Sequence, residues 1–481
     1  MQLRSTFLRV AVLGLLLDPA TAGGDSGAAS PWPKPLGGPG KESATGVAAD
    51  DEGHSFAVGT FDGPSSFGDV HLASAGGSDV FVTALDADAH VLWAVAVGGP
   101  GADEGRGIAL APAPSGGSGD VYVTGTFSGT ADFDPGPGRT ELTSAGGTDA
   151  FLLRLNAKSE LVWARRLGGP QDDVGMRVAA SADAVWVAGT FKGTMDGLAS
   201  AGGSDAFLAK FDLDGHLLWT KRIGGAKDDE GRAVAAGRNG EVWVCGDFEA
   251  GPSIGPDGGG LDMASAGRSD VFILRLDSTG RLLWSGQIGG EGEDTCEGMA
   301  ATNAGGVAVI GEFWHTADVD PGPGVLSYAS HGKTDAFLVS LDGIGRMQWS
   351  QQFGETGADL GLAVAADRFG SVYTTGFLDR RGESVSWVDE HSESGKRTWS
   401  LGLEATGGLH TLAIAASPQG ITTVAGWFKG ETKELREAGA GRVKGFAKND
   451  AFVWRLVPTG PGSRPQRPRL DVQVEPPPGS P

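Results

Sequence analysis

The sequence is poor in cysteine and in long apolar segments. Cysteine occurs only twice, at Cys245 and Cys296, and no Cys-x-x-Cys pair is present. We expect two buried free thiols that pack as small hydrophobic side chains, with a disulfide bond as the alternative in an oxidising compartment. After residue 17 no segment is apolar enough to cross a bilayer, so no membrane span is predicted.

Positive charge is also scarce. Lys and Arg number 38 against 60 Asp and Glu, which gives a net charge of −22 at pH 7. So acidic a chain repels phosphate groups, which argues against nucleic acid and anionic lipid as partners. Although 82 residues are glycine, they follow no three-residue period, which excludes a collagen-like chain.

Catalytic motifs are missing as well. We find no nucleophile elbow, no His-Glu-x-x-His zinc motif and no phosphate-binding Gly-x-x-x-x-Gly-Lys loop. The eight histidines do not share one position of the repeat described below, and His315 beside Trp314 is the first that we would inspect. Loops from different repeats can still converge into an active site that sequence spacing does not reveal.

The N-terminus has the pattern of a secretory signal. Arg4 and Arg9 accompany an apolar stretch over residues 10–17, and Ala20-Thr21-Ala22 is a small-x-small cleavage site. We predict a signal peptide over residues 1–22 and a secreted, periplasmic or cell-surface location. No cysteine follows the apolar stretch, which argues against a lipid anchor.

One tripeptide recurs along the chain and defines a repeat. Gly-Thr-Phe or a variant of it occurs seven times, at spacings between 50 and 66 residues. The copies are Gly59-Thr60-Phe61, Gly125-Thr126-Phe127, Gly189-Thr190-Phe191, Gly246-Asp247-Phe248, Gly311-Glu312-Phe313, Gly376-Phe377 and Gly426-Trp427-Phe428. Self-similarity at a fixed period is typical of repeat architectures.

Two further motifs accompany most copies. Asp-Ala-Phe or Asp-Val-Phe begins at Asp79, Asp149, Asp205, Asp270, Asp335 and Asp450, and Val385-Ser386-Trp387-Val388 stands in its place in the sixth unit. A tryptophan precedes Gly-Gly or its remnant by five residues, at Trp93, Trp163, Trp219, Trp284, Trp349 and Trp399. With an Ala-rich segment before each Gly-Thr-Phe, every unit has the pattern of four short strands.

Seven such units predict an all-β fold, a seven-bladed β-propeller of four-stranded antiparallel blades over residues 23–458. The seventh unit has no Trp strand of its own, whereas Trp32 lies five residues before Gly37-Gly38. We therefore predict that an N-terminal strand over residues 30–36 completes the last blade and closes the ring. Residues 459–481 are Pro-rich without periodicity and are predicted to be a disordered tail.

A known repeat resembles this unit. The segment GGSDAFLAKFDLDGHLLWTKRIGGAKDDEGRAVAAGRNGEVWVCGDF, from Gly202 to Phe248, is similar to the SBBP repeat, a β-propeller repeat of secreted bacterial proteins. The resemblance extends over residues 32–456 and departs in the sixth unit, where the Asp-Ala-Phe motif is lost. It implies an extracellular or cell-envelope protein. It implies no catalytic residues, because the family is defined by its structural repeat.

Carboxylates recur five residues after the first glycine of Gly-Gly or at the equivalent place. They are Glu42, Asp103, Asp173, Asp229, Asp294 and Asp359. Because they precede the innermost strand, we expect them around one mouth of the channel, where they could bind cations or a basic partner. We favour the alternative that each carboxylate caps its own loop, and we favour the same role for the Asp of Asp-Ala-Phe.

Two loops share the sequence Asp-x-Asp-Pro-Gly-Pro-Gly. Asp132 and Asp134 in one loop, and Asp318 and Asp320 in the other, place paired carboxylates beside turn carbonyls, which suits Ca²⁺. Neither loop has the twelve-residue pattern with its closing Glu, so we favour a rigid Pro/Gly hairpin. Calcium is the one cofactor that the sequence leaves open.

Function is predicted as binding rather than catalysis. A rigid propeller presents variable loops, so we expect a monomeric scaffold that recognises an extracellular protein or a glycan. The alternative is a hydrolase or lyase with an active site at the channel mouth. A polar pocket that holds a His with a carboxylate partner would favour the enzyme.

Overall fold

The computed structural model describes residues 34–112, 119–255, 259–261, 263–380, 383–418, 420–431 and 448–456. These ranges are almost entirely antiparallel β-structure, with one short 3₁₀ helix, η1 (Arg238–Gly240), as their sole helical element. No helix in them is long and apolar enough to span a membrane. The predicted signal peptide, Trp32 and the predicted C-terminal tail lie outside the described residues.

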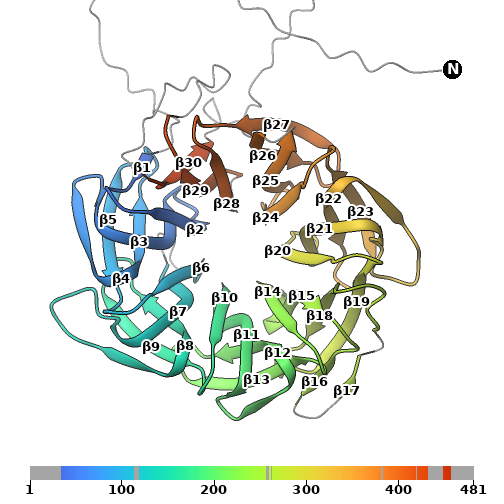
Figure 1. Cartoon of the computed structure of the whole chain (residues 1–481), viewed down its shortest axis with the longest axis horizontal. Coiled ribbons are helices and arrows are strands. Elements are labelled where there is room, and N and C mark those ends of the chain that lie inside the picture. Colours follow the sequence, from blue (N-terminus) through green and yellow to red (C-terminus); the bar gives the residue numbers. More distant parts are fainter. Residues whose placement is uncertain are drawn as a thin grey trace, which may run out of the picture.

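The first strand of each unit lies at the centre of a ring, as Figure 1 shows. These innermost strands are β2 (Glu42–Ala49), β6 (Glu104–Leu110), β10 (Asp173–Ala180), β14 (Asp229–Ala236), β20 (Thr295–Ala301), β24 (Leu360–Ala366) and β28 (Leu409–Ala416). They contain the Ala-rich segments of the repeat, and their small side chains suit the narrow centre, as expected.

The second and third strands of each unit pair with each other and form the buried middle of the ring. The second strands, which contain the Gly-Thr-Phe motif, are β3 (Ser55–Phe67), β7 (Val121–Asp132), β11 (Val185–Met195), β15 (Val242–Phe248), β21 (Val307–Asp318), β25 (Val372–Arg380) and β29 (Thr422–Phe428). The third strands, which contain the Asp-Ala-Phe motif or its replacement, are β4 (Val70–Leu85), β8 (Glu141–Leu155), β12 (Leu198–Phe211), β18 (Asp270–Leu276), β22 (Ser327–Leu341), β26 (Glu383–His391) and β30 (Asp450–Leu456).

The Trp strands lie at the rim, where Figure 1 places them outermost. They are β5 (Val91–Val97), β9 (Leu161–Leu167), β13 (Leu217–Gly224), β19 (Leu282–Gly290), β23 (Met347–Phe353) and β27 (Arg397–Leu403). At the remaining rim position the N-terminal strand β1 (Lys34–Leu36) pairs antiparallel with β30, with Leu36 opposite Ala451. The described part of the predicted strand over residues 30–36 is thus paired with the last unit.

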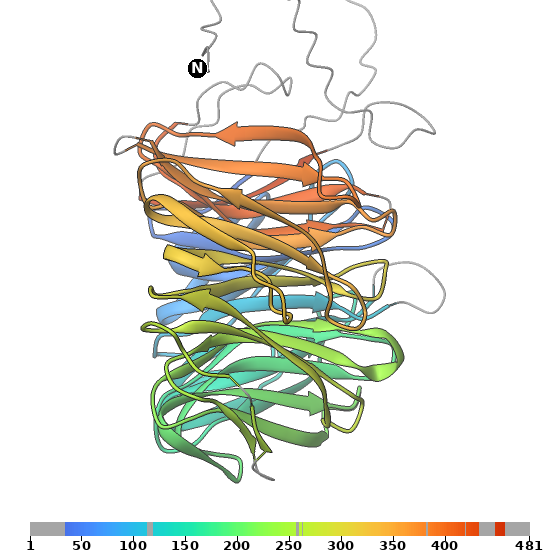
Figure 2. The ribbon, with the colours of Figure 1, turned by 90° about the vertical axis from the view of Figure 1, so that its right-hand side faces the viewer.

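The seven four-stranded groups form six sheets, because two of the groups are joined into one sheet. One further group is extended by two short strands. A hairpin of β16 (Ser253–Gly255) and β17 (Gly259–Gly260) extends the sheet that ends in β13. A two-residue pairing of β19 with β21 joins two groups into one eight-stranded sheet. Figure 2, turned by 90°, shows strands of successive sheets crossing the thickness of a disc.

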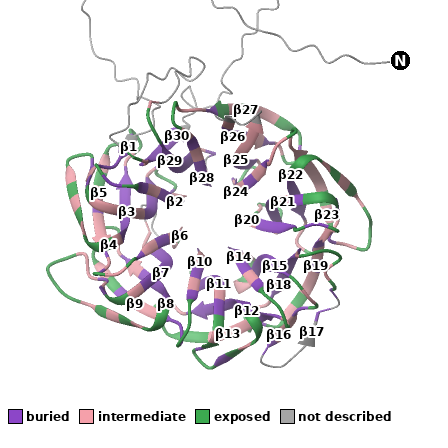
Figure 3. Ribbon diagram, in the orientation of Figure 1, coloured by how far each residue is buried: buried purple, intermediate pink, exposed green. Residues whose placement is uncertain are grey.

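The hydrophobic core lies between neighbouring sheets. Phe56 and Val82 of the first sheet pack with Val123 and Leu153 of the next, and each junction around the ring has a comparable cluster. Figure 3 shows the result, with buried residues on the inner and middle strands and exposed ones on the outer loops. In the sixth unit the buried Trp387 takes the place of the motif phenylalanine.

Every innermost strand has a β-bulge at the same place. The pairing register skips one residue per strand, between Gly105 and Gly107 of β6 for example. We call these seven skipped residues the bulge ring: Thr45, Arg106, Met176, Arg232, Glu297, Leu362 and Leu412. Because a bulge re-aims side chains, this feature decides which residues line the axis.

The prediction of two free thiols is wrong. Cys245 on β15 and Cys296 on β20 form a disulfide between adjacent units, with a Cα–Cα distance of 6.2 Å. The two strands belong to different repeats, and they come within disulfide range only because neighbouring sheets converge toward the axis.

Candidate functional site

The six predicted loop carboxylates are buried and bonded to backbone. Each is at most 1 % exposed, and none lines the central cavity described below. In Asp103, Oδ2 accepts the Gly99 N–H at 2.7 Å and Oδ1 accepts the Ser128 N–H at 3.1 Å. Asp173, Asp229, Asp294 and Asp359 accept bonds from the equivalent backbone groups. These contacts are those of the capping alternative, and cation binding by this set stays a prediction.

Each loop carboxylate faces the Asp-Ala-Phe carboxylate of the preceding unit. A Cβ on Gly98 would fall 2.0 Å from Asp79 Oδ1 and 2.8 Å from Asp103 Oδ2, so the first glycine of Gly-Gly leaves room for both groups. We call these sets the junction pairs: Asp79–Asp103, Asp149–Asp173, Asp205–Asp229, Asp270–Asp294, Asp335–Asp359 and Asp450–Glu42.

Proximity and burial disfavour two negative charges in a junction pair. Burial, with the charge of Asp103 as a smaller cause, raises the pKa of Asp79 to about 6. Burial likewise raises the pKa of Asp173 and of Asp229 to about 7, with their partner carboxylates adding to the shift. Two carboxyl groups in this arrangement share a proton near neutral pH.

The two Asp-x-Asp-Pro-Gly-Pro-Gly loops are closed by their own backbone. Asp132 Oδ1 accepts the N–H groups of Asp134 at 3.1 Å and Thr140 at 2.9 Å. Asp318 Oδ1 accepts the equivalent N–H groups of Asp320 and Leu326 at 3.1 and 2.8 Å. These bonds fit the rigid hairpin, and calcium binding at the loops stays a prediction.

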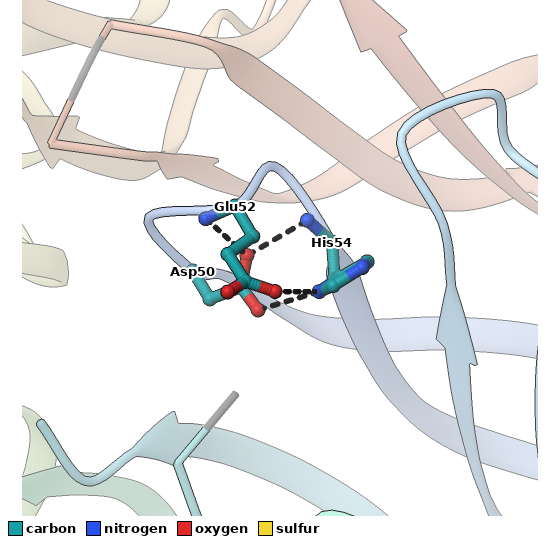
Figure 4. A group of neighbouring side chains, drawn as sticks. All are labelled: Asp50, Glu52 and His54. Carbon is teal, nitrogen blue, oxygen red and sulfur yellow. Dashed lines mark hydrogen bonds and ion pairs between the residues drawn. The ribbon is translucent and has the colours of Figure 1, made fainter. Parts of the chain in front are cut away.

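Three other groups have the residue types of a metal site. Within the described ranges, three sets of two carboxylates and one His place their ligand atoms within 4.8 Å of one another. They are Asp50/Glu52/His54, Asp86/Asp88/His90 and Asp212/Asp214/His216. Figure 4 shows the first set, in which Asp50 Oδ1 accepts the backbone N–H groups of Glu52 and His54 and Asp50 Oδ2 lies 2.8 Å from His54 Nδ1.

The same contact holds turns that contain no histidine. Asp277 Oδ2 pairs with Arg281 Nε at 3.0 Å, four residues on, in the turn equivalent to that of His216. The Asp–His contact is therefore one version of a turn-stabilising contact. His90 and His216 do share a repeat position, contrary to the sequence interpretation, and His315 is an exposed residue of a bulge in β21.

A cavity of about 150 Å³ lies on the axis of the ring, lined by residues of all seven innermost strands. Its wall is asymmetric. Arg106, Arg177 and Glu297 line one side, whereas Leu362 and Leu412 line the other. Most of these residues belong to the bulge ring, so the cavity is formed by side chains that differ from unit to unit.

The guanidinium group of Arg232, in the bulge ring, is surrounded by carboxylates. Arg232 Nη2 lies 2.9 Å from Glu230 Oε2, Nε lies 3.0 Å from Asp247 Oδ2, and Nη1 lies 3.7 Å from Glu297 Oε1. Burial raises the pKa of Asp247 to about 7, although Arg232 opposes the shift. Burial and the charge of Glu297 raise the pKa of Glu312 to about 8.

The disulfide holds the strands of this charged group together. Cys296 precedes Glu297, its N–H donates to Asp247 Oδ1 at 2.9 Å, and Cys245 lies two residues before Asp247. One departure from the repeat in the sequence coincides with this charged group. The middle residue of Gly-Thr-Phe is Thr in the first three units but acidic in the next two, at Asp247 and Glu312.

A serine in a Gly-x-Ser-x-Gly sequence, at residues 251–255, does not form a nucleophile elbow. Ser253 lies on strand β16, between β13 and β17, where its hydroxyl donates to the Gly224 carbonyl at 3.2 Å and accepts from Arg222 at 3.0 Å. Among the residues that line the axial cavity there is no histidine. The His–carboxylate pocket that would favour an enzyme is thus not found in that cavity.

Two curated proteins match parts of the sequence, and no family model matches the chain. The regulatory protein FlaEY of Caulobacter vibrioides is 29 % identical over 187 residues, which cover 37 % of this chain and 19 % of that protein. An uncharacterized WD repeat-containing protein of Acanthamoeba polyphaga mimivirus is 23 % identical over 212 residues, covering 39 % of this chain and 15 % of that protein. The chain thus spans less than a fifth of either relative.

Solved structures give only distant similarity. A puromycin hydrolase mutant complexed with PGG has a TM-score of 0.41 and 13 % identity, over 85 % of this chain and 54 % of that one. The rhamnogalacturonan lyase of Bacillus licheniformis has a TM-score of 0.29 and 11 % identity, over 76 % and 57 %. The rhamnogalacturonan lyase YesW has a TM-score of 0.28 and 11 % identity, over 88 % and 74 %. Scores this low carry no argument about function.

Proposed function

We propose that this chain is an exported, seven-bladed β-propeller that binds a small polar molecule in its central channel. Seven copies of the repeat motif and the pairing of β1 with β30 support the closed seven-bladed ring. The signal-like N-terminus and the Cys245–Cys296 disulfide support export, because disulfides persist in oxidising compartments. The resemblance to the SBBP repeat also predicts an extracellular or cell-envelope protein, and it stays a prediction.

The binding proposal rests on the axial cavity, where charged side chains that differ from unit to unit lie together. Arg106, Arg177 and Glu297 come from three different units and line the same cavity on the axis. Concave sites with a few converging polar groups are where small ligands bind. Five of the six loop carboxylates, all except Glu42, by contrast have both oxygens occupied by backbone N–H groups.

Catalysis by the chain as a hydrolase or lyase is the competing prediction. It needs a general base or nucleophile in reach of a bound substrate. The cavity-lining residues include Glu297 as a candidate base and the Thr45 hydroxyl, but no His, Ser or Cys that would pair with them as in a known nucleophile–base arrangement. Binding without chemistry therefore has the better support.

A thermal-shift screen tests the binding proposal. The full chain is melted with anionic, cationic, neutral and zwitterionic small molecules, and a ligand of the folded state raises the melting temperature. Leu362→Trp fills the cavity and should abolish the shift. Leu92→Trp, on the rim strand β5 where Leu92 is 53 % exposed, is the control and should keep it. A shift retained by Leu362→Trp would place the ligand elsewhere, and Ca²⁺ in the same screen tests the two Asp-Pro-Gly loops.

A further inference from the structure

The arginines around the cavity differ in how far their charge is compensated. Arg232 has carboxylate oxygens of Glu230, Asp247 and Glu297 within 4 Å. Although burial lowers the pKa of Arg232, these carboxylates raise it above its usual value. This guanidinium therefore has no need of a further anion.

Arg177 is the opposite case. Its Nη1 donates to the carbonyl oxygens of Arg106 at 3.2 Å and Met176 at 3.0 Å, and it forms no ion pair with any described residue. Burial lowers the pKa of Arg177, and the charges of Arg106 and Arg232 lower it further, against the opposing effect of Glu297. A guanidinium in this environment is stabilised by any anion that reaches it.

Arg106 adjoins it with an unfilled donor. Its Nη2 lies 2.8 Å from Glu104 Oε2, but its Nε is buried and has no hydrogen-bond partner. A buried donor without a partner is costly, so a ligand that accepts from it is favoured. Guanidinium groups are the side chains best suited to bind a carboxylate or phosphate, and two of them line this cavity.

The opposite wall and the size of the cavity restrict what the anion can be. Leu362 and Leu412 line that wall together with Ile414. The cavity of about 150 Å³ is of the size of an engineered protein cavity of about 150 Å³ that binds a benzene-sized molecule. This space holds a carboxylate with a short hydrocarbon chain, and the apolar wall gives no partner to the remaining oxygens of a phosphate.

We propose that the ligand of the channel is a small organic carboxylate, bound by Arg106 and Arg177 with its hydrocarbon chain against the leucine-lined wall. Because it names the ligand of the same cavity, this proposal rests on the function proposed above. Burial raises the pKa of Glu297, and the guanidinium groups of Arg232 and Arg177 oppose that shift.

Calorimetric titration with four probes tests the proposal on the full chain. Pentanoate is compared with pentanol, pentylamine and inorganic phosphate, so that charge, its sign and the hydrocarbon chain are varied one at a time. We expect pentanoate to bind at least about tenfold more tightly than the other three. Arg177→Met should weaken pentanoate by about tenfold or more, and Arg268→Met, whose side chain is 83 % exposed, should leave it unchanged.

The outcomes separate this proposal from the function on which it rests. Pentanoate binding that Arg177→Met leaves intact, or equal binding of phosphate or pentanol, would overturn the carboxylate assignment. If pentylamine binds and Leu362→Trp abolishes that binding, the carboxylate proposal is wrong. The proposal that the channel binds a ligand would then still hold. If no probe and no compound of the thermal screen binds, the proposed function fails as well. Arg106→Met and Arg177→Lys, with melting curves for each, serve if Arg177→Met does not fold.

Discussion

The bulge ring lies on the innermost strands, and one carboxylate of each junction pair lies at or directly before the start of such a strand, yet the two regions are built in opposite ways. Every junction pair consists of two buried carboxylates, all aspartates except Glu42, and the loop aspartates accept backbone N–H groups. In the bulge ring the residue type changes from unit to unit, and five of the seven residues line the axial cavity: Thr45, Arg106, Glu297, Leu362 and Leu412. Residues that recur in the units stabilise the ring, whereas residues that differ between units line the cavity where we propose that the ligand binds.

The largest effect should come from breaking the ring on which both regions depend. Deleting residues 23–36 removes β1 and the fully buried Leu36 from the edge of β30. We expect a loss of about 3–5 kcal/mol in the free energy of unfolding, measured by urea denaturation. Deleting residues 459–481 is the control and should change nothing. A 23–36 deletion that unfolds like the parent would refute closure by this strand.

Removing the disulfide should lower both the free energy of unfolding and the affinity for the ligand. Cys245→Ala with Cys296→Ala releases a link across 51 residues, and we expect a loss of about 2–4 kcal/mol. Ligand affinity should fall too, because Asp247 and Glu297 lie beside the bond. Thr375 and Thr411 occupy the equivalent positions and share a 2.6 Å hydrogen bond, so Thr411→Val is a matched control that should cost about 1 kcal/mol without affecting affinity.

The junction pairs predict that stability falls as the pH rises. Their pKa values of about 6 to 7 exceed those of the unfolded chain, so the folded state holds more protons between about pH 4 and pH 7. Their stabilisation is therefore complete below about pH 4 and is lost by about pH 7, on the order of 1 kcal/mol per pair. His391 acts in the opposite direction, because burial lowers its pKa to about 4 and its contribution is lost as the pH falls.

Six junction pairs should outweigh one histidine. Urea midpoints at about pH 4.5 and 7.5 measure the slope, and Asp229→Asn, which imitates the protonated carboxyl, should reduce it. Stability that rises between these pH values, or a slope that Asp229→Asn leaves unchanged, would contradict a shared proton.

The smallest effect should distinguish the junctions from one another. Asp149 lies 2.7 Å from Arg166, whereas Ala96 stands at the equivalent rim position beside Asp79. Ala96→Arg should lower the pKa of Asp79 by supplying the missing charge. We expect a stability change below about 1 kcal/mol at neutral pH. The pKa is measured from the Asp79 carboxyl signal in an NMR titration, with Ala96→Gln as the uncharged control. An unchanged titration midpoint in Ala96→Arg would show that a charge on the rim strand does not affect the pair.

Strand positions and the capping role followed from the sequence because both recur. Small residues before Gly-Thr-Phe indicated the innermost strands, and an Asp before a strand indicated a loop cap. The acidic set was expected at the channel mouth, but each carboxylate folds back onto its own Gly-Gly loop, as Asp103 does onto Gly99. A motif position shows where a side chain starts but not where its oxygens are bonded.

The cavity and the disulfide were beyond prediction for a different reason. Arg106 and Glu297 reach the axis because a single unpaired residue shifts the pairing register of their strands, which no residue type announces. Cys245 and Cys296 meet across a junction between two units. Such contacts depend on how sheets pack, and spacing along the chain does not report it.

Two residues four apart on β10 test the division most directly. Asp173 accepts the N–H groups of Gly169 and Lys192, and Arg177 lines the cavity. We predict that Asp173→Ala costs about 2–3 kcal/mol of unfolding free energy and leaves the dissociation constant for pentanoate unchanged. Arg177→Met should weaken pentanoate by about tenfold at nearly unchanged stability. If the two variants exchange these effects, or share them, the separation of ring-building from recognising residues is wrong.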